Sequence, residues 1–377
     1  HGGTEEKRDE GTEGRREEGD VAEDARGLLV ESGELYYRIA ELEMMDNDRA
    51  GVAMWKAAER IEESGDGEAT VAAMRRFMSG YPESSLGPRA LHAIGSAQQR
   101  IGALPDAVET YQENYRRFGQ TPYGAGSLVP LATCYMAMGR GYADQAEQTL
   151  RMIVEDSPVY TPAAPEYADA LFLLGNLLNR SGAHERAIPV LEEAMDRYAD
   201  SPRVPRARFL LGDCYLQSGL SLQAEIETAT FSGELDQLRA ERGRRLRRAA
   251  TLFGEMVASY ESRDASTLTT LDELYLRHAR LYRADSHFEL GEYEQALADY
   301  ERAAWVYKGS ATALTAYVQI LNCHVFTGKE AEAEAALRRA QYLVETLPDD
   351  AFEDGVNLES REDWRRYFEW VKGTGLF

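Results

Sequence analysis

Apolar residues recur at spacings of three and four along most of this chain, which is the period of one face of an α-helix. The pattern is clearest in six similar stretches that each end in Gly: Leu91–Gly102, Leu128–Gly139, Leu171–Gly182, Arg208–Gly219, Arg280–Gly291 and Tyr317–Gly328. A small or apolar residue stands seven positions before each final Gly; these residues are Gly95, Ala132, Gly175, Gly212, Ala284 and Leu321. Each stretch therefore predicts a helix, a turn at the Gly and a second helix.

The small residues of this pattern have a physical role in a helix hairpin. Gly adopts the left-handed conformation that ends a helix without steric cost, so we expect the chain to reverse at each final Gly. Small residues also let two crossing helices approach closely, and we expect three such pairs: Gly95 with Ala107, Gly175 with Ala187, and Gly212 with Ala249. Because one hairpin cannot bury its apolar face alone, successive hairpins are expected to stack into one continuous core.

Three stretches resemble the second half of the tetratricopeptide repeat: GEYEQALADYERA (Gly291–Ala303), GAHERAIPVLEEA (Gly182–Ala194) and GKEAEAEAALRRA (Gly328–Ala340). The joining texts YPESS (Tyr81–Ser85) and YADSP (Tyr198–Pro202) are similar to the repeat variant common in bacterial envelope assembly proteins. The resemblance implies an all-α, right-handed α-solenoid of about six to seven helix hairpins with a C-terminal capping helix. We expect repeat units at about residues 48–82, 88–122, 125–160, 168–202, 205–263, 277–310 and 314–348.

The same resemblance implies a binding surface, because in this family the first helix of each unit lines the concave side. The residue after each small crossing residue then faces inward, and all six are short and polar: Ser96, Thr133, Asn176, Asp213, Asp285 and Asn322. Six further polar residues flank them: Arg89, His92, Arg100, Asn179, Arg180 and Arg206. A peptide-binding groove and an ordinary solvent-facing stripe explain this pattern equally well. The variant of this family that binds the C-terminal carboxylate of a peptide has Lys at the position of Phe172. We therefore do not predict carboxylate binding of that kind for this chain.

One unit carries an insertion, because 30 residues separate Gly219 from Ala249 where five suffice in other units. We expect the extra residues, about 220–248, to lengthen the helix pair into an inserted arm. The arm holds the strongest basic cluster of the chain: Arg239, Arg242, Arg244, Arg245, Arg247 and Arg248. It is a docking patch for carboxylates, phosphates or an acidic partner segment, a site that holds the chain's own acidic tail, or a solvated helix face paired with acids such as Glu241.

The two ends of the chain depart from the repeat. Residues 1–26 contain ten acids and five bases with almost no apolar side chains, which indicates an acidic low-complexity tail before a solenoid over 27–348. Because the chain does not begin with Met, two explanations stay open: the tail is a tether that followed a removed signal or anchor, or His1 is a residue left by expression. Over 349–377, Trp364, Tyr367, Phe368 and Val371 follow helical spacing. We expect a helix opened by Ser360 to cover the last repeat, although its aromatic face is also a candidate docking surface.

Composition excludes several classes of protein. With 65 acidic and 42 basic residues, the 377-residue chain has a formal charge of −23, which disfavours nucleic acid as a partner. Because only five of the basic residues are Lys, this acidity also fits adaptation to high salt. No run of 18 apolar residues is present, so no membrane span is expected. Cys134, Cys214 and Cys323 stand at one register of the repeat and are expected to be small packing residues.

Catalytic chemistry has little support in the sequence. The six His are dispersed, and no HExxH, CxxC, GxSxG or phosphate-loop motif is present. We therefore expect no metal, no cofactor and no enzyme activity, and predict a protein-interaction scaffold that binds a partner or itself through the concave face and the inserted arm. The alternative is an enzyme or small-ligand sensor that uses the superhelical cavity. The compartment stays open, with the periplasm or cell envelope slightly favoured over the cytoplasm.

Overall fold

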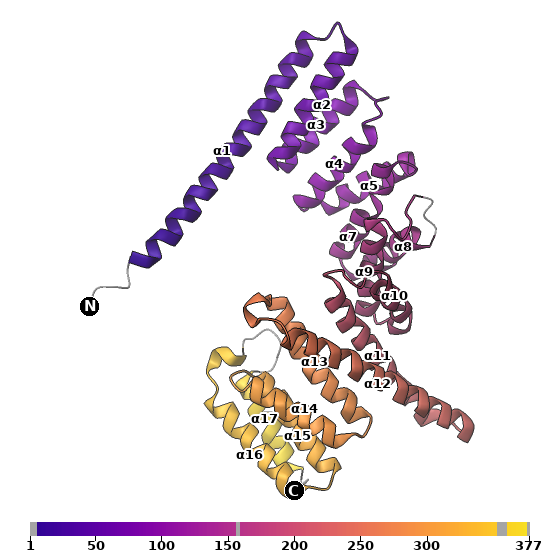
Figure 1. Cartoon of the computed structure of the whole chain (residues 1–377), viewed down its shortest axis with the longest axis vertical. Helices are drawn as coiled ribbons and strands as arrows, with labels where there is room; N and C mark the ends of the chain where they lie inside the picture. The colour runs from indigo at the N-terminus through magenta and orange to yellow at the C-terminus, as the bar shows by residue number, and fades with distance from the viewer. Residues whose placement is uncertain (1–5, 156–158, 353–359, 375–377) are drawn as a thin grey trace. The chain divides into compact units, whose positions relative to one another are not determined.

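A computed structural model describes residues 6–155, 159–352 and 360–374, with side chains from residue 23 onward. Throughout those ranges the regular structure is α-helix with three short 3-10 helices, and no strand is present (Figure 1). The predicted all-α fold class is therefore confirmed. The chain divides into two compact units, His1–Leu173 and Leu174–Phe377, and the boundary falls inside one helix.

The described part of the first unit contains nine helical segments before that boundary. They are α1 (Glu6–Leu42), α2 (Asn47–Ser64), α3 (Gly67–Gly80), α4 (Gly87–Arg100), α5 (Leu104–Phe118), the single turn α6 (Pro122–Ala125), α7 (Leu128–Met138), η1 (Arg140–Tyr142) and α8 (Ala143–Val154). Helix α9 (Pro165–Arg180) crosses the boundary. The second unit continues with α10 (His184–Arg197), α11 (Val204–Thr228), α12 (Ser232–Glu261), η2 (Ala265–Thr267), α13 (Thr270–Glu289), α14 (Tyr293–Val306), α15 (Thr312–Phe326), α16 (Glu330–Thr346), η3 (Asp349–Phe352) and α17 (Arg361–Gly373).

Within each unit a helix packs mainly on its neighbours in sequence. In the first unit α2 packs on α3, α3 on α4, α4 on α5 and α5 on α7. In the second unit the same order runs from α10 through α11, α12, α13, α14 and α15 to α16. The predicted hairpins of helices are thus present and touch one another in turn, as a stacked repeat requires. Each unit has its own apolar core, built around Trp55 and Phe77 in the first and around Tyr300 and Leu337 in the second.

Glycine closes six of the helix pairs, with φ between +70° and +102° at Gly65, Gly102, Gly139, Gly182, Gly291 and Gly328. Five of these turns were expected from the sequence, and Gly65 adds one in the first, degenerate unit. The expected turn at Gly219 is wrong, because Gly219 lies inside α11. The helix continues there since Leu222, one turn onward, is buried and extends the apolar face.

The small residues do allow close helix contact, and the atoms nearest to an added Cβ belong to bulky residues of the second helix. A Cβ added to Gly95 would lie 2.7 Å from the ring of Tyr111, and one added to Gly175 would lie 2.4 Å from Leu191. At Gly212 the nearest atom would belong to Phe253, at 2.8 Å. Each of these bulky residues follows the expected Ala by four positions, so the missing side chain makes room for a large group one turn further along.

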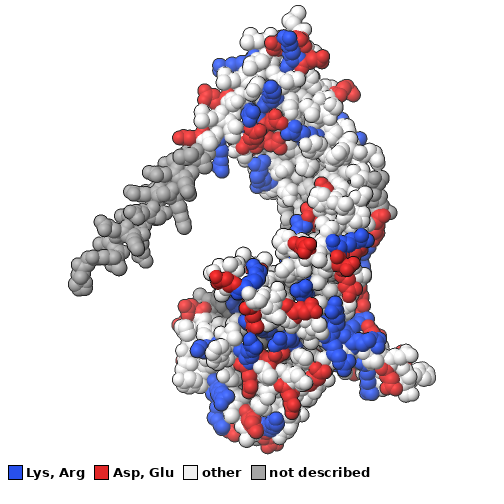
Figure 2. Space-filling model, in the orientation of Figure 1, with Lys and Arg blue, Asp and Glu red and all other residues white. Residues whose placement is uncertain are grey.

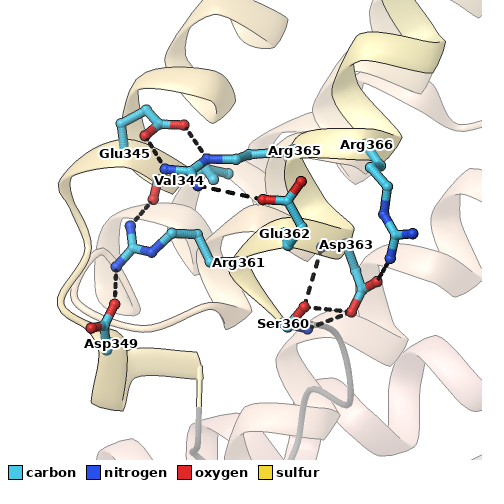
Figure 3. Close-up of polar contacts among 9 residues, drawn as sticks. All are labelled: Val344, Glu345, Asp349, Ser360, Arg361, Glu362, Asp363, Arg365 and Arg366. Atoms are coloured by element: carbon cyan, nitrogen blue, oxygen red, sulfur yellow. Dashed lines mark hydrogen bonds and ion pairs between the residues drawn. The ribbon is translucent and has the colours of Figure 1, made fainter.

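The last helix covers the end of the repeats. Ser360 caps α17 through a capping box with Asp363, and Trp364, Phe368 and Val371 are buried in the core that α15 and α16 share. Figure 3 shows Arg361 reaching back to the carbonyl of Val344 and to Asp349, with 2.8 Å to the Asp349 carboxylate. Arg365 pairs with Glu345 at 2.7 Å (Figure 3). Tyr367, also expected on the covering face, is partly exposed.

Candidate interaction surfaces

The insertion lengthens both helices of its pair. Helix α11 has 25 residues and α12 has 30, and they run against each other with Leu222 and Leu246 buried near the start of the extension. The six arginines of the cluster all lie on α12. Because a helix turns every 3.6 residues, this run of arginines cannot share one face, and the structure separates five of the six into an inner and an outer set.

Arg242 and Arg245 form the inner set and hold α12 to its neighbours. Arg242 donates to the main-chain carbonyl of Glu289 at 2.7 Å and pairs with the carboxylate of the same residue on α13. Arg245 donates to Glu241 at 2.8 Å and pairs with Glu185 on α10. Hydrogen bonds from the guanidinium lower the pKa of the Glu241 carboxyl. These two arginines are committed to contacts within the chain.

Arg244, Arg247 and Arg248 lie on the outer side of α12, and we call these three residues the cationic face. Their spacing of three and four places them together on exposed helix surface. Arg244 pairs with Glu241, one turn away, and its side chain stays 66% exposed. Arg247 and Arg248 have no ion pair with any residue that the structure describes. Figure 2 shows Lys and Arg side chains gathered over α12. Arg239 is also exposed but lies on another side of the helix.

In the first unit, most of the predicted inner-face residues already have partners within the chain. Arg89 pairs with Glu59 on α2 at 2.8 Å and lies over the ring of Trp55. Arg100 donates to the carbonyl of Gly65 at 2.9 Å. Thr133 accepts a hydrogen bond from Gln99 at 3.0 Å. These contacts link successive helix pairs, so they stabilise the stack.

The other two predicted residues of the first unit differ in exposure. His92 is half-buried between the rings of Tyr111 and Tyr123, and burial lowers its pKa. Ser96 is exposed on α4 beside Tyr111. Ser96 is thus the most accessible of the short polar residues that we predicted in this unit.

In the second unit the predicted residues divide in the same way. Asn179 donates to Asp213 at 2.8 Å, which joins α9 to α11, and Asn322 donates to Gln319 at 2.9 Å. Asp285 is half-buried and accepts a hydrogen bond from Tyr300, and partial burial raises its pKa to about 6. The side chains of three predicted residues have no hydrogen bond or ion pair with the described part of the chain: Asn176, Arg180 and Arg206.

The residues that complete these contacts could not be found from sequence. Glu289 and Glu185 lie 47 and 60 residues from the arginines they bind, and nothing in their local sequence distinguishes them from other acids. Gln99 and Asn179 carry a weak signal. Each stands three residues after an inner-face position and donates 34 residues ahead, which is about one repeat.

The three cysteines occupy the kind of site that the sequence predicts. Cys134, Cys214 and Cys323 are free and buried, and burial raises their pKa values to about 11, 12 and 11. They are packing residues, as predicted.

Across the described residues no group of three His, Cys, Asp or Glu is arranged to hold a metal ion. None of the described helices has the length and apolar character needed to cross a membrane.

Comparison with known proteins identifies the repeat. The family model for the tetratricopeptide repeat matches residues 169–201 and 278–310, within one residue of two predicted units. No curated protein matches the sequence.

Solved structures with a similar arrangement of helices include a tetratricopeptide repeat protein from Parabacteroides merdae, at 15% identity and a TM-score of 0.42 over 90% of this chain and 99% of that one. Another is a signal-transduction ATPase with a tetratricopeptide repeat sensor from Pyrococcus horikoshii, at 13% identity and a TM-score of 0.46 over 92% of this chain and 50% of that one. These values carry no information on what the present chain binds.

Proposed function

Because two stretches of this chain match the tetratricopeptide repeat, we propose that it is a non-catalytic scaffold that binds an acid-rich segment of a partner protein. The binding surface is the cationic face of α12, and the observation that carries the proposal is the exposure of unpaired Arg247 and Arg248 in a chain of charge −23. The texts YPESS and YADSP support the finer proposal that it is of the type found in bacterial envelope assemblies.

The chemistry of arginine favours a carboxylate-bearing ligand. A guanidinium offers two parallel N–H groups to a carboxylate, and such charge-assisted pairs are stronger than neutral hydrogen bonds. Three arginines within two turns of a helix can contact acids spaced along an extended or helical segment. Because the chain as a whole has a formal charge of −23, an acidic ligand is attracted at the cationic face and repelled by the net charge of the chain.

The inner face is proposed as a second contact for the same partner. Asn176, Arg180 and Arg206 are polar side chains of the second unit without partners among the described residues, so they can hydrogen-bond to an incoming chain without breaking an existing contact. We do not include Asp285 and Asn179 in this contact, because each already has a hydrogen bond to another side chain of the second unit. Ser96 remains a candidate contact in the first unit.

A binding measurement with a defined probe tests this proposal. The probe is a fluorescent glutamate-rich peptide, titrated with the full chain and followed by fluorescence anisotropy. Replacing Arg247 and Arg248 together by Ser is expected to weaken binding about tenfold. Added salt should weaken binding to the unmodified chain more than binding to the variant, since the variant has fewer ion pairs to screen.

The control removes the same charge from another helix. Arg338 and Arg339 are adjacent and exposed on α16, so Arg338→Ser with Arg339→Ser should leave peptide affinity within about twofold. Both double variants should keep the thermal midpoint of the unmodified chain, because none of these side chains is buried. Equal weakening by the two variants, or no binding of the acidic peptide at all, would refute the role of the cationic face.

A further inference from the structure

Helix α1 carries a second apolar face that no helix of its own unit covers. Leu28, Leu35, Ile39 and Leu42 are 66%, 53%, 44% and 85% exposed. Together with Ala25 and Ser32 they recur at alternating steps of three and four residues, which is the pattern of a coiled-coil seam. We call residues 25, 28, 32, 35, 39 and 42 the α1 seam. Its length, 18 residues, corresponds to about 27 Å of helix.

A different set of residues packs α1 into the first unit. Gly33, Tyr37 and Ala40 are buried, and a Cβ on Gly33 would lie 2.8 Å from Ile61 of α2. These positions are also spaced by three and four, but they lie on another side of the helix. The α1 seam is therefore additional to the face that packs α1 on α2. Figure 1 shows α2 along one side of α1 and no helix of this unit along the other.

The spacing of the seam favours a helix as its occupant. Knobs at alternating steps of three and four fit between the side chains of another helix, whereas an extended strand repeats every two residues. Over its first four residues the seam also alternates small and large side chains, with Ala25 and Ser32 beside Leu28 and Leu35. An antiparallel copy of the same helix can place Ser32 opposite Leu35 and Ala25 opposite Leu42, so that each small residue faces a large one.

That antiparallel arrangement has a definite register. Leu28 lies opposite Ile39 of the other copy, Leu35 opposite Ser32, and Leu42 opposite Ala25. In this register Glu31 falls beside Arg38 of the other copy, and by symmetry Arg38 falls beside the other Glu31. Both residues border the seam, are exposed and have no ion pair with any described residue. The charge pattern is thus complementary to itself, as a two-fold symmetric contact requires.

We propose that the α1 seam is a self-association surface on which α1 of a second copy packs antiparallel, with two reciprocal Glu31–Arg38 ion pairs. This proposal does not depend on the cationic face of α12, which belongs to the other unit. It provides one function beyond partner capture: a dimer presents two copies of every binding surface, which raises the avidity for a partner with repeated binding segments.

Sedimentation velocity of the full chain over a wide range of concentration is the first test. We expect a monomer–dimer equilibrium that Leu35→Glu weakens about a hundredfold, because symmetry places the buried charge at two points of the interface. Leu271→Glu provides the matched control, since Leu271 is 49% exposed on α13 and lies outside the seam. Both variants should retain the helical circular dichroism of the unmodified chain. A chain that stays monomeric at all concentrations would overturn the proposal, whatever else binds the seam.

Charge reversal tests the register. Glu31→Arg alone and Arg38→Glu alone should each weaken the dimer about tenfold, because each turns two attractive pairs into repulsive ones. The double variant, with Glu31→Arg and Arg38→Glu, should restore the original dissociation constant. Glu34→Arg changes the same charge on α1 outside the proposed pairs and should have little effect. If the double variant loses as much dimer affinity as the two single variants lose together, this antiparallel pairing is excluded.

Discussion

Asp285 shows how one register of the repeat can hold residues with different roles. It occupies the position that holds Ser96 and Asn176 in other units, but it is half-buried and its carboxylate accepts a hydrogen bond from Tyr300 of α14. Burial raises the pKa of Asp285 to about 6, the nearby Glu289 adds to that increase, and the Tyr300 hydroxyl opposes it. The folded protein therefore holds this acid at a cost whenever the carboxyl is ionised.

We predict that Asp285→Asn makes the protein more stable at neutral pH. A folded-state pKa of about 6, above the ordinary value of Asp, means that the folded state binds the proton more tightly than the unfolded state. The free energy of unfolding therefore falls as the pH rises from about 4 to about 6 and stays low above that range. Asn keeps an oxygen for Tyr300 and has no charge, so the variant should gain about 2 kcal/mol at pH 7 and nothing at pH 4.

Urea unfolding at several pH values, followed by circular dichroism, measures this difference. Asp200→Asn is the matched control, because Asp200 is exposed and the same substitution there should change stability little at any pH. A difference between Asp285→Asn and the unmodified chain that is the same at pH 4 and pH 7 would mean that ionisation of Asp285 is not its cause.

On the scale of the element, α12 has some arginines that bond within the chain and others that are exposed to solvent. The inner pair, Arg242 and Arg245, reaches carboxylates on α13 and α10, whereas the cationic face points to solvent. A guanidinium that is mostly buried and bonded to a main-chain carbonyl and a carboxylate contributes to stability, while an exposed one contributes little. The insertion therefore extends a helix pair and is attached to its neighbours by charge.

We predict that Arg242→Gln lowers the free energy of unfolding by about 1.5 kcal/mol, because it leaves the Glu289 carboxylate and carbonyl without their charged donor. Arg247→Gln, on the same helix, should change stability by less than about 0.5 kcal/mol. Urea unfolding of the two variants at pH 7 distinguishes them. If both lose the same stability, the separation of α12 into an inner and an outer set is wrong.

The sequence predicts the elements of this fold much better than the surfaces. Gly182, Gly291 and similar residues place the turns, because a left-handed turn after a helix has few alternatives to Gly. The pattern failed at Gly219, where buried Leu222 favours more helix over a turn. The sequence shows the arginine cluster, but not which arginines bond within the chain and which face solvent. That difference depends on acidic residues that lie many positions away in the sequence. Nothing in one helix alone reveals Glu289.

On the scale of the whole molecule, stability in each unit comes from contacts between neighbours in sequence. Helix α16 packs on α15 and on α17, and the core of the second unit continues through these three helices. Because each helix pair depends on the next for its apolar cover, a defect at one end should loosen nearby pairs first. The capping helix α17 is where this expectation can be tested, since it is the last cover of the stack.

Phe368→Ala removes a fully buried ring of α17 that stacks on Trp364 and packs in the core with α15 and α16. Such a substitution typically costs about 3 to 5 kcal/mol at the site. In hydrogen exchange we expect faster amide exchange in α15, α16 and α17 and unchanged exchange in α2 to α5. Trp370→Ala removes a ring that is 65% exposed on the same helix and should leave exchange unaltered throughout. Equal acceleration in α2 to α5 would instead mean that both units unfold in one cooperative step, which repeat packing between neighbours does not predict.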